Sequence, residues 1–138
     1  MKFLLLVIPM ILISEDIKIN TINRVYDGDT FFVQMTDCRK PDIVCKDMGI
    51  RVFGIDTPEI RTTSVREKEL ALKAKTISEE FLKNPKKILL KNCQKDKFFR
   101  LDCDVYNDKN VSLKDVLIQN KVAVPYFGDT KLVNWDTF

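Results

Sequence analysis

The chain has 138 residues, of which 45% are hydrophobic and 31% are charged, and its formal net charge is +3. This length and composition are typical of one globular domain with its own core, and they exclude wholesale disorder. The sequence contains no histidine, which excludes nucleophiles activated by an imidazole and zinc sites with imidazole ligands. Any catalysis therefore depends on carboxylates, Lys, Arg, Tyr, Cys or a hard metal ion.

The N-terminus has the features of an export signal. A short basic start, Met1-Lys2, precedes an unbroken apolar run over residues 3–13. This run is shorter than the roughly 20 residues that a membrane-spanning helix needs, and it fits the apolar core of a signal peptide. We therefore predict a signal peptide at residues 1–14, a mature domain over residues 15–138 and an exported protein, secreted or periplasmic, with no stable membrane association once the signal is cleaved. The alternatives are an uncleaved membrane anchor formed by residues 3–13 and a buried strand.

The apolar pattern of the remaining chain predicts five strands and two helices. An Asp-Gly turn with positive φ joins the first two strands, and a polar loop over residues 36–48 precedes the third. Apolar residues spaced four, three and four apart predict a helix over residues 65–83. Ser112 is the expected cap of the second helix. The predicted strands cover residues 17–26, 30–35, 50–55, 88–90 and 99–106, and residues 122–127 form a last extended segment.

This order of elements predicts a mainly β chain with helices. One helix follows the third strand and another follows the fifth. That arrangement favours a small closed β-barrel of the α+β class over a parallel α/β sheet.

Four cysteines, an even number, suggest two disulfides in an exported chain. Three pairings are possible. The local ones, Cys38–Cys45 and Cys93–Cys103, would each close a loop between two strands. The alternatives are four free thiols in a reducing compartment and a zinc site of four thiolates, which the long spacings disfavour.

Carboxylates gather on two turns, each at the end of a hydrophobic strand. The first turn is YDGDT at residues 26–30, and the second is RVFGIDTPE at residues 51–59. If the two turns meet, they form an all-oxygen pocket of the kind that Ca²⁺ prefers. Taken singly, each acid is explained as well by an ordinary turn or helix start. Strand alternation places Arg51 and Asp56 on one face only if the chain bends near residues 56–58.

The strings Asp-Gly-Asp-Thr and Asp-Thr-Pro-Glu, in this order, resemble the staphylococcal nuclease (thermonuclease) family. The segment DKFFR at residues 96–100 is similar to that family's Asp-Lys-Tyr-Gly-Arg. The resemblance covers residues 20–128, nearly all of the predicted mature chain. It implies an OB-fold, a five-stranded β-barrel with two packed helices, in a compact variant that lacks most of the family's C-terminal helix.

The resemblance also implies roles for the acidic residues. Asp29 and Asp56 match the family's calcium-binding carboxylates, and Thr57 matches the residue whose backbone carbonyl binds the same ion. Glu59 matches the carboxylate that acts on the attacking water. Asp27 matches a nearby acid that supports the ion's ligands.

The implied substrate contacts come from three segments of the chain. Arg51 and Arg100 match the two arginines that hold the scissile phosphate, and Lys97, Phe98 and Tyr126 match nucleotide-binding positions. Three residues depart from the family pattern. They are Phe98 in place of Tyr, Phe99 in place of Gly, where its ring is expected to crowd the approach to Arg100, and Gly128 in place of a second pocket Tyr.

These residues together predict a calcium-dependent endonuclease or phosphodiesterase. By the resemblance, it hydrolyses DNA and RNA, preferably single-stranded, to 3′-phosphate and 5′-hydroxyl ends, and acts as a monomer. The chemistry is consistent, because Ca²⁺ and two guanidinium groups can stabilise the charge that builds on phosphorus. One alternative is a catalytically weak or inactive nuclease-like OB module that binds nucleic acid or protein. Another is an exported barrel with a structural Ca²⁺ site, which would not need Arg51 and Arg100.

Overall fold

The structure is a computed structural model that describes residues 16–36, 43–128, 130–131 and 133–138. The predicted signal peptide and the alternative anchor lie outside the described residues. Among the helices that the structure does describe, none combines the length and the apolar character needed to cross a bilayer.

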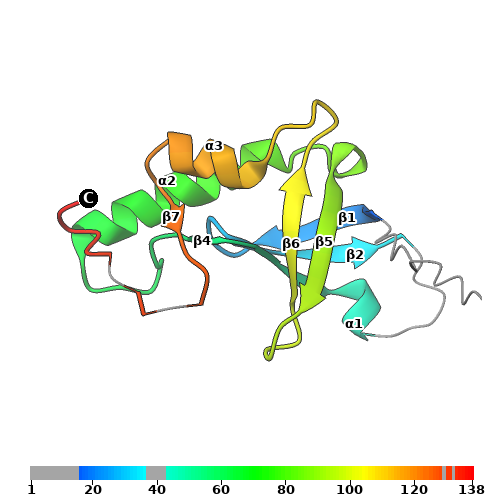
Figure 1. The fold of residues 1–138 in the computed structure, drawn as a ribbon, viewed down its shortest axis with the longest axis horizontal. Coiled ribbons are helices and arrows are strands. Elements are labelled where there is room, and N and C mark those ends of the chain that lie inside the picture. Colours follow the sequence, from blue (N-terminus) through cyan, green and yellow to red (C-terminus); the bar gives the residue numbers. More distant parts are fainter. Residues whose placement is uncertain (1–15, 37–42, 129, 132) are drawn as a thin grey trace, which may run out of the picture.

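Five strands close into a barrel in the order β1-β2-β3-β6-β5 (Figure 1). Neighbouring strands are antiparallel except β3 and β6, which run parallel. A separate short pair, β4 (Ile55–Asp56) with β7 (Val124–Pro125), adjoins the barrel. The α+β barrel predicted from the sequence is therefore confirmed. The barrel strands are β1 (Ile17–Val25), β2 (Thr30–Met35), β3 (Met48–Val52), β5 (Leu89–Lys95) and β6 (Leu101–Tyr106).

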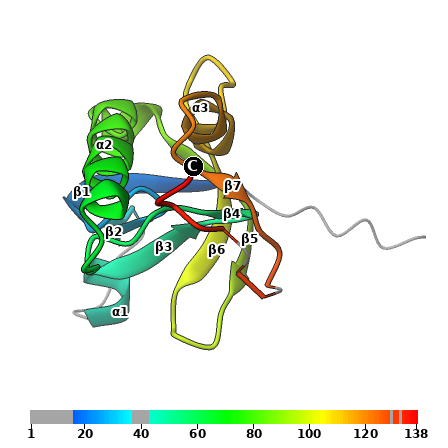
Figure 2. The same cartoon turned by 90° about the vertical axis from the view of Figure 1, so that its left-hand side faces the viewer.

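Two helices, α2 (Val65–Phe81) and α3 (Leu113–Gln119), contact each other and cover one end of the barrel (Figures 1 and 2). Helix α2 begins after Ser64, whose hydroxyl accepts a hydrogen bond of 3.1 Å from the N–H of Glu67. Its buried face is Leu70, Ala71, Ala74 and Ser78. Two shorter elements, α1 (Ile43–Lys46) and the 3-10 turn η1 (Pro85–Lys87), complete the described helices.

Side chains that alternate in direction along the strands fill the interior of the barrel. In β2, Phe31 and Val33 are buried while Phe32 and Gln34 are partly exposed, which is the period of two that a half-buried strand requires. Each aliphatic or aromatic side chain buried in this way contributes about 1.5–3 kcal/mol. The same alternation turns the intervening side chains outward, and on β3 and β6 these include charged residues.

Several predicted boundaries are wrong for local reasons. The third strand ends at Val52, because Gly54 adopts a φ of +83° and turns the chain before β4. The predicted polar loop over residues 36–48 contains α1 and the first residue of β3. The predicted strand over residues 99–106 begins only at Leu101. Ser112 precedes α3 as expected, but its side chain makes no capping hydrogen bond.

Gly28 is required by close packing and not, as predicted, by a positive φ. A Cβ atom at this position would lie 2.7 Å from the Cβ of Ala74 and 3.0 Å from the Cγ2 of Thr57. The hydroxyl of Ser78 donates a 2.6 Å hydrogen bond to the Gly28 carbonyl. Helix α2 thus holds the turn between β1 and β2 through contacts that only glycine permits.

We expect Gly28→Ala to lower the free energy of unfolding by about 1–3 kcal/mol, because the added methyl overpacks a closed contact. Urea unfolding measures the change. In the double variant with Ala74→Gly, the opposing methyl is absent, so the two substitutions should show a favourable coupling energy. A Gly28→Ala variant as stable as the parent would contradict the contact.

Candidate active site

A cleft of about 600 Å³ lies on one side of the barrel. Its walls come from the turn between β1 and β2, from strands β2, β3, β4 and β6, from the tip of the β5–β6 hairpin, and from the segments that follow β4 and β7. The cleft is lined by every predicted catalytic, metal and nucleotide residue except Thr57. The lining side chains are the acids Asp27, Asp29, Asp56, Glu59, Asp96 and Asp102, the bases Arg51, Lys97, Arg100 and Lys131, and Tyr26, Thr30, Phe32, Phe98 and Tyr126, with Gly128.

The turn between β1 and β2 presents two buried carboxylates. The N–H of Asp29 donates to Asp27 Oδ1 at 3.1 Å, and the Thr30 hydroxyl donates to Asp29 Oδ1 at 2.9 Å. Burial, together with the neighbouring charge of Asp29, raises the pKa of Asp27 to about 8. The surroundings of the turn therefore do not fully stabilise the negative charge that Asp27 and Asp29 would carry if both were ionised.

The second acidic turn, residues 51–59, contains β4 and the residues that follow it. The pairing of β4 with β7 places Asp56 opposite Val124, and the Asp56 side chain is buried. Glu59 is about half exposed, with 53% of its side chain accessible. Its backbone N–H donates to the carboxylate of Glu67 at 3.1 Å, which ties this turn to the first turn of α2. Burial raises the pKa of Glu59, and the charge of Lys131 opposes that rise.

Arg51 extends from β3 into the cleft. It lies in register with Thr30 of β2 and Asp102 of β6. Its Nη2 donates to the Ile55 carbonyl at 3.2 Å and lies 4.0 Å from Asp29 Oδ2. The bend at Gly54 makes this contact possible, so the turn that brings Arg51 to the second acidic turn comes earlier than residues 56–58, where the sequence placed it.

Arg100 is held at the hairpin tip by Asp96. The carboxylate of Asp96 accepts hydrogen bonds from the N–H groups of Phe98 (2.8 Å) and Arg100 (2.9 Å) and from Arg100 Nε (2.8 Å). Burial alone would raise the pKa of Asp96, but these hydrogen bonds hold it below its ordinary value. Asp96 is therefore a positioning residue. The sequence feature that could have identified Asp96 is its position four residues before Arg100, at the start of the DKFFR segment.

The sequence reasoning missed two further residues of the cleft. Lys131 places its Nζ 2.9 Å from Asp56 Oδ1 and 3.8 Å from Glu59 Oε1. Asp102 has a buried Oδ1 that finds no hydrogen-bond partner among the described residues, and burial raises the pKa of this carboxyl. No motif marks either residue. Asp102 becomes visible only through its register with Arg51, and Lys131 only through the fold of the C-terminal segment.

The chain matches a known protein family over part of its barrel and both of its longer helices. The family model described as staphylococcal nuclease homologue matches residues 49–135. The chain belongs to this family. A search of curated proteins found no match. The part matched to the staphylococcal nuclease homologue model contains Arg51, Asp56, Glu59 and Arg100. Asp29 lies outside it, but the barrel brings Asp29 into the same cleft.

For a staphylococcal nuclease homologue, the donor set must be tested against a hard cation. Among the described residues, no group of three or more Asp, Glu, Cys or His side chains is arranged to hold a metal ion. The predicted metal ligands are not such a group of three side chains. They are two carboxylates, Asp29 and Asp56, and the backbone carbonyl of Thr57. Both carboxylates are buried, and the Lys131 ammonium already lies against Asp56. The Thr57 hydroxyl is buried and has no hydrogen-bond partner within the part of the chain that the structure describes. The donor set of two carboxylates and one carbonyl consists of oxygen atoms only, which is the chemistry that a hard cation such as Ca²⁺ takes.

The departures from the staphylococcal nuclease pattern affect the rim of the cleft. Phe99, which is expected to crowd the approach to Arg100, is 90% exposed and is not among the residues that line the cleft. At Gly128, the described residues other than its chain neighbours place no atom within 4 Å of the position that a Cβ would take. The Tyr126 ring is 5.9 Å from the guanidinium carbon of Arg51.

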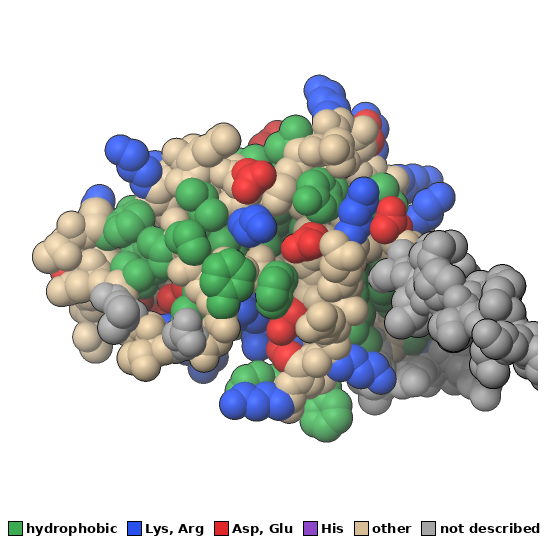
Figure 3. Space-filling view, viewed as in Figure 1, with side chains coloured by type: hydrophobic (Ala, Val, Ile, Leu, Met, Phe, Trp, Pro, Cys, Tyr) green, Lys and Arg blue, Asp and Glu red, His purple; other side chains and the backbone are tan. Residues whose placement is uncertain are grey.

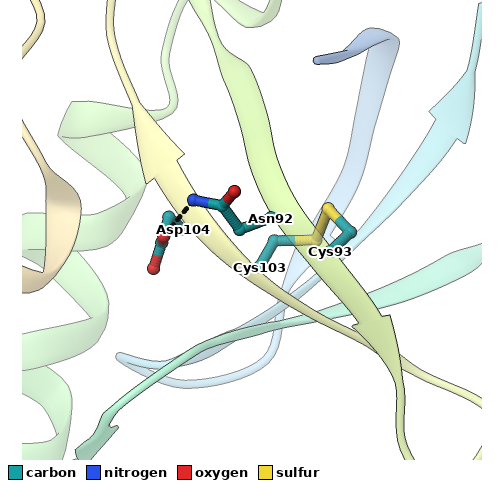
Figure 4. Close-up of a disulfide and its surroundings, with 4 residues drawn as sticks. All are labelled: Asn92, Cys93, Cys103 and Asp104. Carbon is teal, nitrogen blue, oxygen red and sulfur yellow. Dashed lines mark hydrogen bonds between the residues drawn. A yellow bond between two sulfur atoms is a disulfide. The ribbon is translucent and has the colours of Figure 1, made fainter. Parts of the chain in front are cut away.

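A disulfide between Cys93 and Cys103 joins β5 to β6, with the two Cα atoms 4.2 Å apart (Figure 4). Beside it, the Asn92 amide donates to the Asp104 carboxylate at 2.9 Å. The hairpin whose tip carries Arg100 is therefore linked across its two strands. Cys45 is also disulfide-bonded, whereas Cys38 lies outside the described residues.

Proposed function

We propose that this chain is a calcium-dependent endonuclease that hydrolyses DNA and RNA to 3′-phosphate and 5′-hydroxyl ends. Membership of the family supports a nuclease-like module that interacts with nucleic acid. The observation that carries the proposal is the cleft itself. It gathers two arginines and four of the predicted acids from segments far apart in the sequence.

In the proposed reaction, Arg51 and Arg100 bind the scissile phosphate. They enter the cleft from β3 and from the hairpin tip, so they can hold non-bridging oxygens from two directions. Guanidinium groups bind phosphate oxygens in bidentate fashion and stabilise the charge that grows in the transition state. The contacts to Ile55 and Asp96 fix both groups before the substrate arrives.

Glu59 orients the attacking water and accepts its proton. The water oxygen forms a bond to phosphorus, the bond from phosphorus to the 5′ oxygen breaks, and the leaving oxygen takes a proton from solvent to become a hydroxyl. Glu59 suits this role because its side chain lines the cleft and remains half exposed, so water can reach it. Ca²⁺ held by Asp29, Asp56 and Thr57 would supply positive charge beside the phosphate and favour ionisation of the water.

Asp27 supports the ion's ligands in this proposal. Its carboxylate accepts the Asp29 N–H at 3.1 Å, which sets the conformation of the turn that carries Asp29. Burial raises the pKa of Asp27, so a protonated Asp27 would limit the repulsion within the turn.

Single strands are the preferred substrates in this proposal. Four aromatic side chains, Tyr26, Phe32, Phe98 and Tyr126, line the cleft, and unpaired bases can stack on such rings. Lys97 and Phe98 at the hairpin tip and Tyr126 after β7 are the nucleotide contacts. The alternative, a module that only binds nucleic acid or protein, leaves the joint placement of Arg51, Glu59 and Arg100 unexplained.

We also propose that residues 1–14 are a signal peptide that directs export, with an uncleaved anchor at residues 3–13 as the alternative. We further propose that the exported protein is a monomer. The Cys93–Cys103 disulfide supports an oxidising destination, because such bonds persist in secreted and periplasmic proteins. Mass spectrometry of the protein recovered outside the cytoplasm would find the new N-terminus near residue 15.

The function is tested by incubating the purified mature chain with single-stranded DNA and RNA oligonucleotides. We expect cleavage with Ca²⁺, loss of cleavage in excess chelator and recovery when Ca²⁺ is added back. The products should carry 3′-phosphate, so a 3′-phosphatase should change their mobility. A Glu59→Gln preparation purified in parallel controls for contaminating nucleases. Cleavage that persists in chelator would contradict the metal requirement, and binding without cleavage under any divalent ion would favour the binding module.

A further inference from the structure

The tip of the β5–β6 hairpin exposes two adjacent aromatic side chains. Phe98 is 63% exposed and Phe99 is 90% exposed. Single exposed hydrophobic residues are common on protein surfaces, but two neighbouring rings at a projecting turn are not needed for solubility or packing. Figure 3 shows hydrophobic side chains together with basic ones at this tip, away from the helices.

The backbone holds Phe99 in an unfavourable conformation. Its φ is +61°, in the left-handed region that side chains other than glycine rarely adopt. The Asp96 carboxylate accepts the N–H groups on both sides of it, from Phe98 and Arg100, and so fixes the turn. A strained residue whose ring contributes nothing to the core is a candidate for a role in binding.

The two rings differ in their relation to the cleft. The Phe98 ring lines the cleft, with Lys97 Nζ and Arg100 Cζ each 5.3 Å from its centroid. Phe99 follows directly and is outside the lining. A chain that has one phosphate at Arg100 and continues past the hairpin tip would therefore bring its next base to Phe99.

We propose that Phe99 is a stacking platform for a base of single-stranded nucleic acid that flanks the phosphate held by Arg51 and Arg100. The inference rests on the proposed function, since it uses the same cleft. Lys97 and Arg100, which lie against the neighbouring Phe98 ring, supply the charge that a phosphate backbone requires. The ring requires an unpaired base, because a base within a duplex is already stacked on both faces. Phe99 thereby favours single strands over duplexes.

Binding is measured by fluorescence anisotropy with a labelled single-stranded oligonucleotide and Ca²⁺, in a Glu59→Gln background so that the strand stays intact. Loss of one stacked base should weaken binding by about 5- to 150-fold in Phe99→Gly. Phe99→Tyr should retain the affinity, because it keeps the ring. Phe99→Leu should lose it, although it keeps the bulk and the conformational demand. Phe53→Leu, at an exposed ring outside the cleft lining, is the matched control and should bind normally.

A series of strands, each lacking one base, locates the contact. At one position the missing base should weaken the parent and leave Phe99→Gly unchanged, so that the two proteins bind that strand equally. Duplex binding should not depend on Phe99. Equal affinity of Phe99→Gly and the parent for intact single strands would overturn the proposal. A Phe99 dependence seen with anionic phospholipid vesicles and not with oligonucleotides would assign the tip to a membrane surface and would also overturn it.

The same variants with Glu59 intact separate this inference from the proposed function. If the parent fails to cleave but binds in a Phe99-dependent way, the stacking platform stands and the nuclease assignment fails. If the parent cleaves and its binding does not depend on Phe99, the nuclease assignment stands and the stacking platform fails. A urea midpoint for Phe99→Gly at or above that of the parent excludes unfolding as the cause of weaker binding, because glycine relieves the left-handed conformation.

Discussion

Arg51→Lys is expected to lower kcat/KM for oligonucleotide cleavage by about 10²- to 10³-fold, the loss typical of removing one charge-stabilising donor from an active site. The Arg51 side chain is only 17% exposed, and its Nη2 contacts the Ile55 carbonyl at 3.2 Å. A guanidinium can keep this contact and still present its other donors to a phosphate. A lysine ammonium is a single point of charge and cannot bridge both partners in the same geometry.

The measurement is the initial rate of cleavage at several substrate concentrations, with thermal unfolding to show that the fold is retained. The loss should appear mainly in kcat, because the arginine acts on the charge of the transition state. Arg66→Lys is the matched control, since Arg66 lies at the exposed start of α2 outside the cleft. Its activity should be that of the parent. Near-normal activity in Arg51→Lys would remove Arg51 from the proposed mechanism.

The barrel could be predicted because its signals are local. Phe31 and Val33 are spaced two residues apart along one strand, and the structure buries both while it leaves Phe32 and Gln34 partly exposed. The acidic strings at residues 26–30 and 51–59 could be found for the same reason. The strand ends were less predictable, because the turn at Gly54 depends on a positive φ that the hydrophobic pattern does not encode.

The assembly of the site depends on contacts between distant segments. Ala74 and Ser78 of α2 hold the Gly28 turn, and this packing places Asp29 beside the second acidic turn. Lys131 reaches Asp56 only because the chain returns after β7. The resemblance supplied Asp29 and Asp56 without supplying these supports. Motif reasoning therefore identified most of the residues that line the cleft and missed those that position them or balance their charge.

Removal of the Cys93–Cys103 disulfide is expected to lower the free energy of unfolding by about 3 kcal/mol, the chain-entropy value for a closed loop of this length. The two cysteines are 10 residues apart, and Cys103 is completely buried in the barrel. The ladder between β5 and β6 is irregular between Lys91 and Gln94, next to the bond. The covalent link therefore supports the hairpin where its hydrogen bonding is weakest.

The test is urea unfolding of the double variant Cys93→Ala/Cys103→Ala beside the parent, each with and without reductant. Reductant should destabilise the parent more than the double variant, because only the remaining disulfide of Cys45 is left to break in the latter. Cleavage should fall in the double variant at temperatures well below global unfolding, since Asp96 and Arg100 sit at the tip of the loosened hairpin. A double variant with unchanged stability would mean that the strand pairing alone holds the hairpin. Unchanged stability with reduced cleavage would instead assign the bond to the geometry of Arg100.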